Sequence, residues 1–101
     1  MNGGEKRVDL RFVVDDGAAR ALTVERRSLL PAGVVSVEGR FEPADLVQIV
    51  TTDGRRLGTG LTRYSAADIK RIRGERSERI LEILGHDNGN EIVHCDYLVL
   101  E

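Results

Sequence analysis

The chain has 101 residues, of which 41% are hydrophobic and 32% charged, and its formal net charge is −2. This composition is typical of a folded protein with a single hydrophobic core and excludes a disordered segment of low hydrophobicity and high net charge. No apolar run approaches the roughly 20 residues that cross a bilayer, and the N-terminus lacks the apolar region of a signal peptide, so we expect a cytoplasmic protein without a membrane partner.

Residues 1–7 are polar and have no periodic apolar pattern, so we expect a flexible tail followed by one domain over residues 8–101. Within that domain, alternation of apolar and polar residues predicts strands, and Pro, Gly and Asn-Gly or Asp-Gly positions mark their ends. The predicted strands cover residues 8–14, 34–38, 46–52 and 56–64, with closing strands at 92–93 and 97–100.

The connection between the third and fourth predicted strands contains Asp53-Gly54. This pair is favoured in the type I′ turn, where both central residues need a positive φ. The sequence therefore predicts a β-hairpin with a two-residue type I′ turn.

Three short helices are predicted, over residues 17–24, 66–73 and 77–85. Asp15 or Asp16 caps the first, Ser65 the second and Ser77 the third, because these side chains accept hydrogen bonds from unpaired amides of the first turn. The third helix has one apolar face, made by its four aliphatic residues Ile80, Leu81, Ile83 and Leu84. Five to six short strands with two to three short helices and no βαβ alternation indicate a mixed, β-rich α+β fold, a small barrel.

A catalytic site is not apparent in the sequence. Nucleophilic catalysis needs a nucleophile beside a base and an orienting group, and the only such set is His94, Cys95 and Asp96. If these residues lie on a strand, adjacent side chains point to opposite faces, so His94 and Cys95 do not meet. We therefore expect no enzyme activity from this chain alone.

Metal and phosphate-loop sites are also not indicated. Cys95 is the only cysteine, and the eight-residue separation of His86 and His94 fits no common zinc motif. The glycines between residues 54 and 60 lie in a hairpin without a following Gly-Lys-Ser/Thr, so they are interpreted as turn and bulge residues. The sequence predicts neither a cofactor nor a metal.

Charge is distributed unevenly along the chain. Between Arg55 and Arg79, eight basic residues against three acidic ones give a net charge of +5, which leaves −7 for the remainder. Such a segment either steers a polyanion to one face or forms a solvated helix surface with ordinary ion pairs such as Glu75–Arg79. Only four aromatic residues are present, which argues against an extended base-stacking platform.

A resemblance to a known family rests on motifs in a fixed order and spacing. The motifs are Asp16-Gly-Ala18, Ser28-Leu-Leu-Pro-Ala-Gly-Val34, Val37-Glu-Gly39, Gly60-Leu61, Tyr64-Ser65, Ile83-Leu-Gly85, His94 with Asp96, and Leu98-Val-Leu100. Together they make the chain similar to the C-terminal PUA domain of bacterial glutamate 5-kinase, over nearly its whole length after the tail. The resemblance implies a PUA-like pseudo-barrel. It also implies a module without the preceding amino-acid-kinase domain, which phosphorylates glutamate in proline synthesis.

The family further implies a candidate RNA-binding site, because PUA domains of pseudouridine synthases and archaeosine transglycosylases bind RNA with the first helix, its following loop and a nearby strand. The matching positions are Arg26, Arg27, Ser28, Pro31, Ala32, Gly33 and, on the predicted closing strand, Tyr97. Arg63, Lys70 and Arg71 of the basic segment complete the candidate set. The sequence departs from the glutamate-kinase pattern at His94-Cys-Asp-Tyr97, where His-Arg-Asp-Asn is expected, and at Arg63, where asparagine is expected.

Two functional hypotheses follow from these features. The first is a non-catalytic module that binds structured RNA through arginines and loop amides. The second is a regulatory or architectural domain that contacts an amino-acid kinase domain without RNA, and an exposed apolar patch would favour it.

Overall fold

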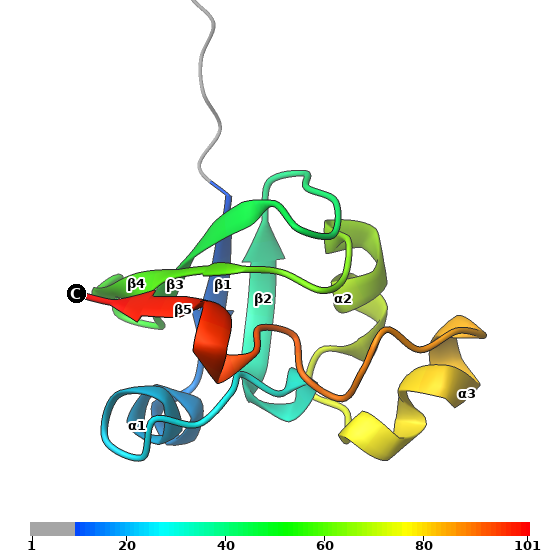
Figure 1. Ribbon diagram of the computed structural model, residues 1–101, viewed down its shortest axis with the longest axis horizontal. Coiled ribbons are helices and arrows are strands. Elements are labelled where there is room, and N and C mark those ends of the chain that lie inside the picture. The colour runs from blue at the N-terminus through cyan, green and yellow to red at the C-terminus, as the bar shows by residue number, and fades with distance from the viewer. Residues whose placement is uncertain (1–9) are drawn as a thin grey trace, which may run out of the picture.

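A computed structural model describes residues 10–101, and Figure 1 shows how their elements are arranged. The elements in chain order are β1 (Arg11–Val14), α1 (Asp16–Thr23), the 3-10 turn η1 (Pro31–Gly33), β2 (Val34–Glu38), β3 (Leu46–Thr51), β4 (Arg56–Leu61), α2 (Ala66–Ile72), the 3-10 turn η2 (Ser77–Arg79), α3 (Ile80–Leu84), the 3-10 turn η3 (Cys95–Tyr97) and β5 (Leu98–Leu100). The predicted tail and the first two residues of the first predicted strand lie outside the described residues.

The five strands form one mixed sheet in the order β2-β1-β3-β4-β5. β1 and β3 are parallel, and the other three neighbouring pairs are antiparallel. α1 lies on one side of the molecule, and α2 and α3 pack together on the other (Figure 1). This arrangement confirms the predicted α+β class. No helix within residues 10–101 combines the length and apolar character that a membrane span requires.

The core lies against one face of the sheet. Phe12 and Val14 are fully buried while Arg11 and Val13 are half-buried, as the period-two pattern predicts. The Phe12 ring meets Phe41 edge to face, with ring centroids 5.5 Å apart. Burying a side chain such as Phe12 contributes about 1.5–3 kcal/mol, and these residues join the buried faces of α1 and α2 in one cluster.

The β3–β4 hairpin is present as predicted, but the predicted type I′ turn is wrong. Of the turn residues only Gly54 has a positive φ, 89°, and Thr51 N donates to Arg55 O at 2.9 Å around a three-residue loop. The Thr51 hydroxyl donates to the Asp53 carboxylate and accepts from Arg55 N. These side-chain bonds stabilise the longer loop, and the bond from Thr51 lowers the pKa of Asp53.

The first two helices begin as predicted. The Asp15 carboxylate accepts from Ala18 N at 2.7 Å, and Ser65 Oγ accepts from Asp68 N at 3.2 Å. Each bond satisfies an amide that has no partner inside its helix.

The third predicted helix differs from the observed one. Ser77 does not cap it, because its hydroxyl donates to Asn90 O at 2.9 Å, and the segment begins as the 3-10 turn η2 before α3. Ile80 is buried, whereas Leu81 is 57% exposed, so the prediction of one apolar face fails at Leu81. Gly85 ends α3 with a φ of 82°, as a helix C-terminal glycine does.

Tyr64 anchors the loop that follows α3. β4 ends at Leu61, so Tyr64 lies beyond the strand that was predicted to include it. Tyr64 is fully buried, and its hydroxyl donates to Gly89 O at 2.6 Å and accepts from Asn88 N at 2.8 Å. Burial raises the pKa of Tyr64, which keeps the hydroxyl neutral as a donor.

The closing strands are shorter than predicted. Ile92 is not in a strand, and Val93 forms only an isolated bridge to Leu29. Tyr97 belongs to η3 and not to a strand, because His94 Nδ1 accepts from Asp96 N at 3.0 Å and closes a turn. Only Leu98–Leu100 pairs with β4.

Candidate functional site

The loop after α1 begins with a backbone conformation that is rare for a residue with a side chain. Arg26 has a φ of 55°, in the left-handed region that costs a non-glycine residue roughly 1–2 kcal/mol. Backbone bonds on both sides hold the turn, from Arg27 N to Ala21 O at 3.0 Å and from Glu25 N to Arg20 O at 3.3 Å. The Arg26 backbone is therefore fixed by its surroundings.

The same loop is joined to the end of the chain. Cys95 N donates to Ser28 Oγ at 2.8 Å, and Leu29 pairs with Val93 through backbone bonds. These contacts bring the predicted loop residues next to η3 and β5, although 67 positions separate Ser28 from Cys95.

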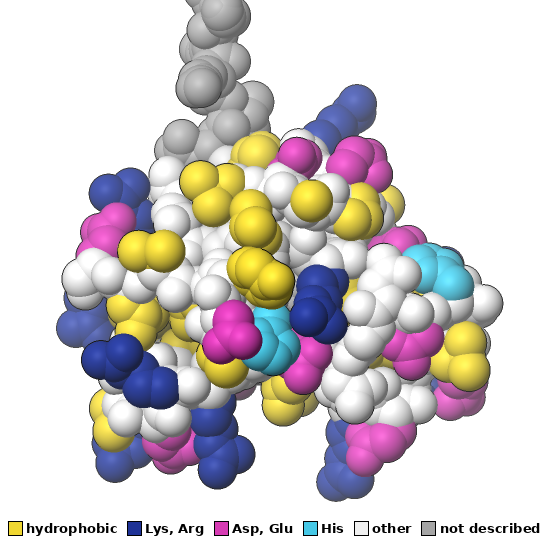
Figure 2. Space-filling model, in the orientation of Figure 1, with side chains coloured by type: hydrophobic (Ala, Val, Ile, Leu, Met, Phe, Trp, Pro, Cys, Tyr) yellow, Lys and Arg dark blue, Asp and Glu magenta, His cyan; other side chains and the backbone are white. Residues whose placement is uncertain are grey.

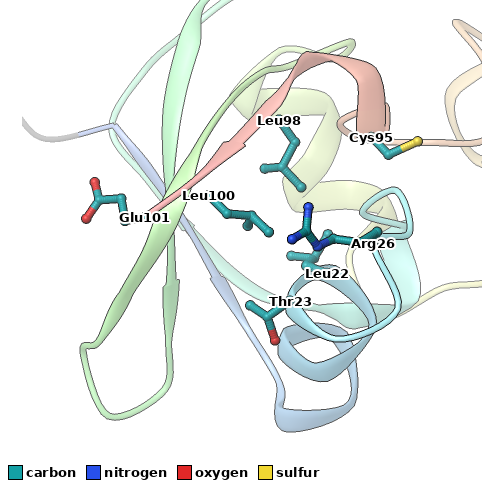
Figure 3. A pocket seen from close by; sticks show the side chains of 7 residues that line it. All are labelled: Leu22, Thr23, Arg26, Cys95, Leu98, Leu100 and Glu101. Atoms are coloured by element: carbon teal, nitrogen blue, oxygen red, sulfur yellow. The ribbon is translucent and has the colours of Figure 1, made fainter.

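A hollow of about 430 Å³ lies between α1, this loop and β5. Figure 3 shows its lining, in which Arg26 extends from the loop toward Leu98 and Leu100 of the edge strand. The other lining residues are Leu22, Thr23, Cys95 and Glu101. The hollow thus combines an apolar wall with one cation.

The electrostatics of the hollow favour an anion. Within residues 10–101, no acidic side chain is paired with Arg26. Glu101 also lines the hollow, but its carboxylate is paired with Arg56 at 2.9 Å. Arg27, next to Arg26, is paired with Glu25 at 3.0 Å, although its side chain remains 74% exposed. Arg26 is consequently the cation at this site whose charge is not locally compensated by the described part of the chain.

η1 packs tightly on α1 beside this site. A Cβ on Gly33 would lie 2.5 Å from Ala18 Cβ, so only glycine fits without a shift. Gly33 N donates to Leu30 O at 3.1 Å, Gly33 O accepts from Asp15 N at 3.0 Å, and the Pro31 side chain is buried. Pro31 and Gly33 therefore position the loop, while Ala32 between them is exposed.

Tyr97 lies close to the other end of the site. Its side chain is 56% exposed, and its ring centroid is 6.2 Å from that of His94. The structure thus brings Arg26, Arg27, Ser28 and Tyr97 to the two segments that flank the hollow.

The remaining three candidates lie elsewhere. Lys70 and Arg71 are on α2, which packs against α3 on the side of the molecule away from α1 (Figure 1), and Arg71 donates to Ile83 O at 2.6 Å. Arg63 follows β4, pairs with Glu91 at 3.3 Å, and donates its backbone N–H to Ile92 O.

Ion pairs neutralise part of the basic segment. The predicted Glu75–Arg79 pair is present at 2.9 Å, and Arg79 also meets Glu82, which raises the pKa of Arg79. Arg56 and Arg63 pair with acidic residues from outside the segment. Three of the eight basic residues of the segment are thus paired with carboxylates, while Arg71 and Arg73 donate to backbone carbonyl groups.

The predicted separation of His94 and Cys95 is wrong. The two residues lie at the start of η3 and not on a strand, and Cys95 Sγ is 3.9 Å from His94 Nδ1. His94 Nδ1 already accepts from the Asp96 backbone, so its lone pair serves the turn and is not free to act as a base or as a metal ligand.

The wall of the hollow was not predicted from the sequence. Leu98 and Leu100 alternate with exposed Val99, a signal that the two share one face. Their proximity to Leu22 and Thr23 depends on the contact between the two ends of the chain, which no local pattern shows.

Glutamate 5-kinases of several bacteria match most of the chain. It is 48% identical over 90 residues to glutamate 5-kinase of Deinococcus radiodurans, covering 89% of this chain and 25% of that protein. It is 45% identical over 87 residues to glutamate 5-kinase of Dehalococcoides mccartyi, covering 86% and 23%. The chain thus spans about a quarter of the length of these relatives and matches their C-terminal regions.

Solved structures share the fold at low sequence identity. A PUA domain of Aeropyrum pernix, in complex with tartrate, superposes with a TM-score of 0.62 at 23% identity, covering 85% of this chain and 41% of that one. A chain of the archaeal box H/ACA sRNP Nop10-Cbf5 complex superposes with a TM-score of 0.55 at 16% identity, covering 91% and 23%.

A family model gives the assignment. The model described as the PUA domain matches residues 10–84, which include β1 to β4 and all three α-helices. With the shared sheet and the identity to glutamate 5-kinase C-terminal regions, this chain belongs to the PUA domain family.

Proposed function

We propose that this chain is a non-catalytic, cytoplasmic PUA module that binds structured RNA at the hollow between α1 and β5. The observation that carries the proposal is the position of Arg26, a cation without a carboxylate partner among residues 10–101, held by a left-handed backbone beside an apolar wall. A phosphate at Arg26 gains a charge-assisted contact, while a ribose or base edge contacts the wall.

The other candidate residues either contact RNA directly or hold the loop in place. Arg27 supplies a second phosphate contact after leaving Glu25, and Tyr97 offers an exposed ring for stacking at the other flank. Ser28, Pro31 and Gly33 hold the loop, and Ala32 lets the RNA backbone approach closely. Arg63, Lys70 and Arg71 contact only an RNA that extends beyond the hollow.

The size of the site limits the affinity. When two phosphates are neutralised, the logarithm of the binding constant falls with the logarithm of the salt concentration with a slope of about −2. Binding therefore weakens about tenfold between 50 and 200 mM salt. The relation to glutamate 5-kinase supports the further proposal that this RNA contact is an accessory function of such a kinase in proline biosynthesis.

Affinity measurements on two variants test the proposal. Arg26→Gln removes the cation but keeps a polar side chain with the same three carbon positions, and we expect binding to bulk tRNA to fall about tenfold and the salt slope to decrease by about one. Arg40→Gln is the matched control, because Arg40 is also exposed but lies in the loop between β2 and β3. An equal loss of tRNA affinity in both variants would show that only the net charge of the chain matters and would refute a site at Arg26.

A further inference from the structure

Strand register places three apolar side chains together on the outer face of the sheet. Leu46 of β3 pairs with Leu61 of β4, and Thr59 of β4 pairs with Val99 of β5. Paired residues in a sheet point to the same face, and so do residues two apart on one strand. Leu46, Leu61 and Val99 therefore form one surface, which we call the apolar strip.

The apolar strip is exposed to solvent. Leu46 is 60% exposed, Leu61 38% and Val99 69%. In Figure 2 hydrophobic side chains gather over this region of β4 and β5. Such a patch measures a few hundred Å², the size at which surface patches of monomers commonly have a binding role.

The strip begins where the chain enters the described fold. β1 and β3 are parallel, so both strands start at the same end of the sheet, and Gln48 N donates to Leu10 O at 2.8 Å. Leu46 precedes Gln48 by two positions and lies at that end. In glutamate 5-kinases, about three quarters of the protein precedes the region that this chain matches, so in those proteins the preceding part is joined to the end of the sheet at which Leu46 lies.

The size of the strip favours a tethered partner over a second copy. A stable complex between separate proteins buries about 800 Å² on each partner, which the strip does not supply. Domains of one chain need less intrinsic affinity, because a short linker gives an effective concentration in the millimolar range. Contacts between domains of a chain also tend to be small and partly polar.

We propose that the apolar strip docks a catalytic domain of the glutamate 5-kinase type. The strip lies on the face of β5 opposite to the residues that line the RNA site, so the two sites act independently. Leu46 and Leu61 lie nearest the linker in this arrangement, and Val99 extends the contact to the edge strand. The outer face of the sheet then contacts the kinase domain, while the hollow beside α1 stays accessible to RNA.

Methyl NMR tests this proposal on the intact 101-residue chain. The chain is labelled at Leu and Val methyl groups and titrated with unlabelled Deinococcus radiodurans glutamate 5-kinase from which the matched 90-residue region has been removed. We expect shifts of Leu46, Leu61 and Val99 methyls, half-saturating at roughly 0.1–1 mM, as suits a contact that a linker normally assists. Leu81 and Val35 are internal controls, because both are exposed and lie outside the strip.

Matched variants make the result specific. The double substitution Leu46→Gln with Leu61→Gln weakens binding roughly tenfold or more, whereas Leu81→Gln leaves it unchanged. Absence of methyl shifts, or shifts confined to the control methyls, overturns the proposal. Shifts of the strip that depend on the concentration of the chain alone identify a second copy as the occupant and also overturn it. Because the double variant keeps Arg26, unchanged tRNA binding separates a failure here from a failure of the RNA site.

Discussion

The contact between η1 and α1 gives the most quantitative prediction. Gly33→Ala introduces a Cβ 2.5 Å from Ala18 Cβ, about 1 Å closer than the optimal separation of two carbon atoms. Because Gly33 has no left-handed backbone conformation, the cost comes from this overlap alone. Overpacking of this kind lowers the free energy of unfolding by about 1–3 kcal/mol.

A second substitution relieves the overlap. Ala18→Gly removes the opposing methyl group, after which the nearest atom to the new Cβ is Ala18 Cα at an ordinary 3.6 Å. Alone, Ala18→Gly lowers the free energy of unfolding by about 0.5–1 kcal/mol, as glycine does inside a helix. We therefore expect the double variant to be no less stable than Ala18→Gly, with a coupling energy of about 1–3 kcal/mol that matches the loss from Gly33→Ala alone.

Urea unfolding followed by circular dichroism measures all four proteins of this cycle. Gly17→Ala on the same helix is the control, because its new Cβ meets only Asp15 Oδ1 at 3.5 Å, and it should be neutral or stabilising. Additive losses from Ala18→Gly and Gly33→Ala would refute the reasoning, and so would a Gly33→Ala variant as stable as the parent.

Two further predictions concern hydrogen bonds that hold the loops. Tyr64→Phe removes the bonds to Gly89 and Asn88 and should lower the free energy of unfolding by about 1–3 kcal/mol near neutral pH. The pKa of Tyr64 is raised in the folded state, so its contribution is full below pH 10 and is lost as pH rises through the folded pKa. Denaturant titrations between pH 8 and 11 should show a steeper alkaline decline for the parent than for Tyr64→Phe, and parallel curves would contradict this. Ser28→Ala leaves the Cys95 amide without its protein partner and should cost about 0.5–1.5 kcal/mol, with faster hydrogen exchange at Cys95; an unchanged exchange rate there would show that the bond does not hold η3.

Local signals in the sequence predicted most of the secondary structure. Local patterns predicted β2 and β3 to within one residue and the end of β1, whereas β4 ends three residues before the predicted Tyr64. Capping side chains predicted the starts of α1 and α2, because both kinds of signal depend on neighbours within four positions. The turn after β3 was misassigned because the Thr51 side chain bonds Asp53 and Arg55 and stabilises a longer loop. Asp-Gly alone does not encode that choice.

The end of the chain was harder to predict because distant contacts determine it. Tyr97 lies in a turn closed by the His94 side chain, and Val93 pairs with Leu29 across the fold. The family resemblance identified the loop from Arg26 to Gly33, but the hollow required the position of β5 relative to α1. The separation of Lys70 and Arg71 from this site likewise follows from packing of α2 on α3 and not from their charge.

The central claim is that RNA contacts the hollow between α1 and β5, and an amide NMR titration tests it most directly. The ¹⁵N-labelled chain is titrated with bulk tRNA at about 50 and 200 mM salt, the range over which the phosphate contacts are expected to weaken tenfold. We expect shifts at residues 26–33 and 95–100 that diminish at the higher salt, with the amides of α2 unchanged. An absence of shifts at the lower salt, or shifts centred on Lys70 and Arg71, would contradict it.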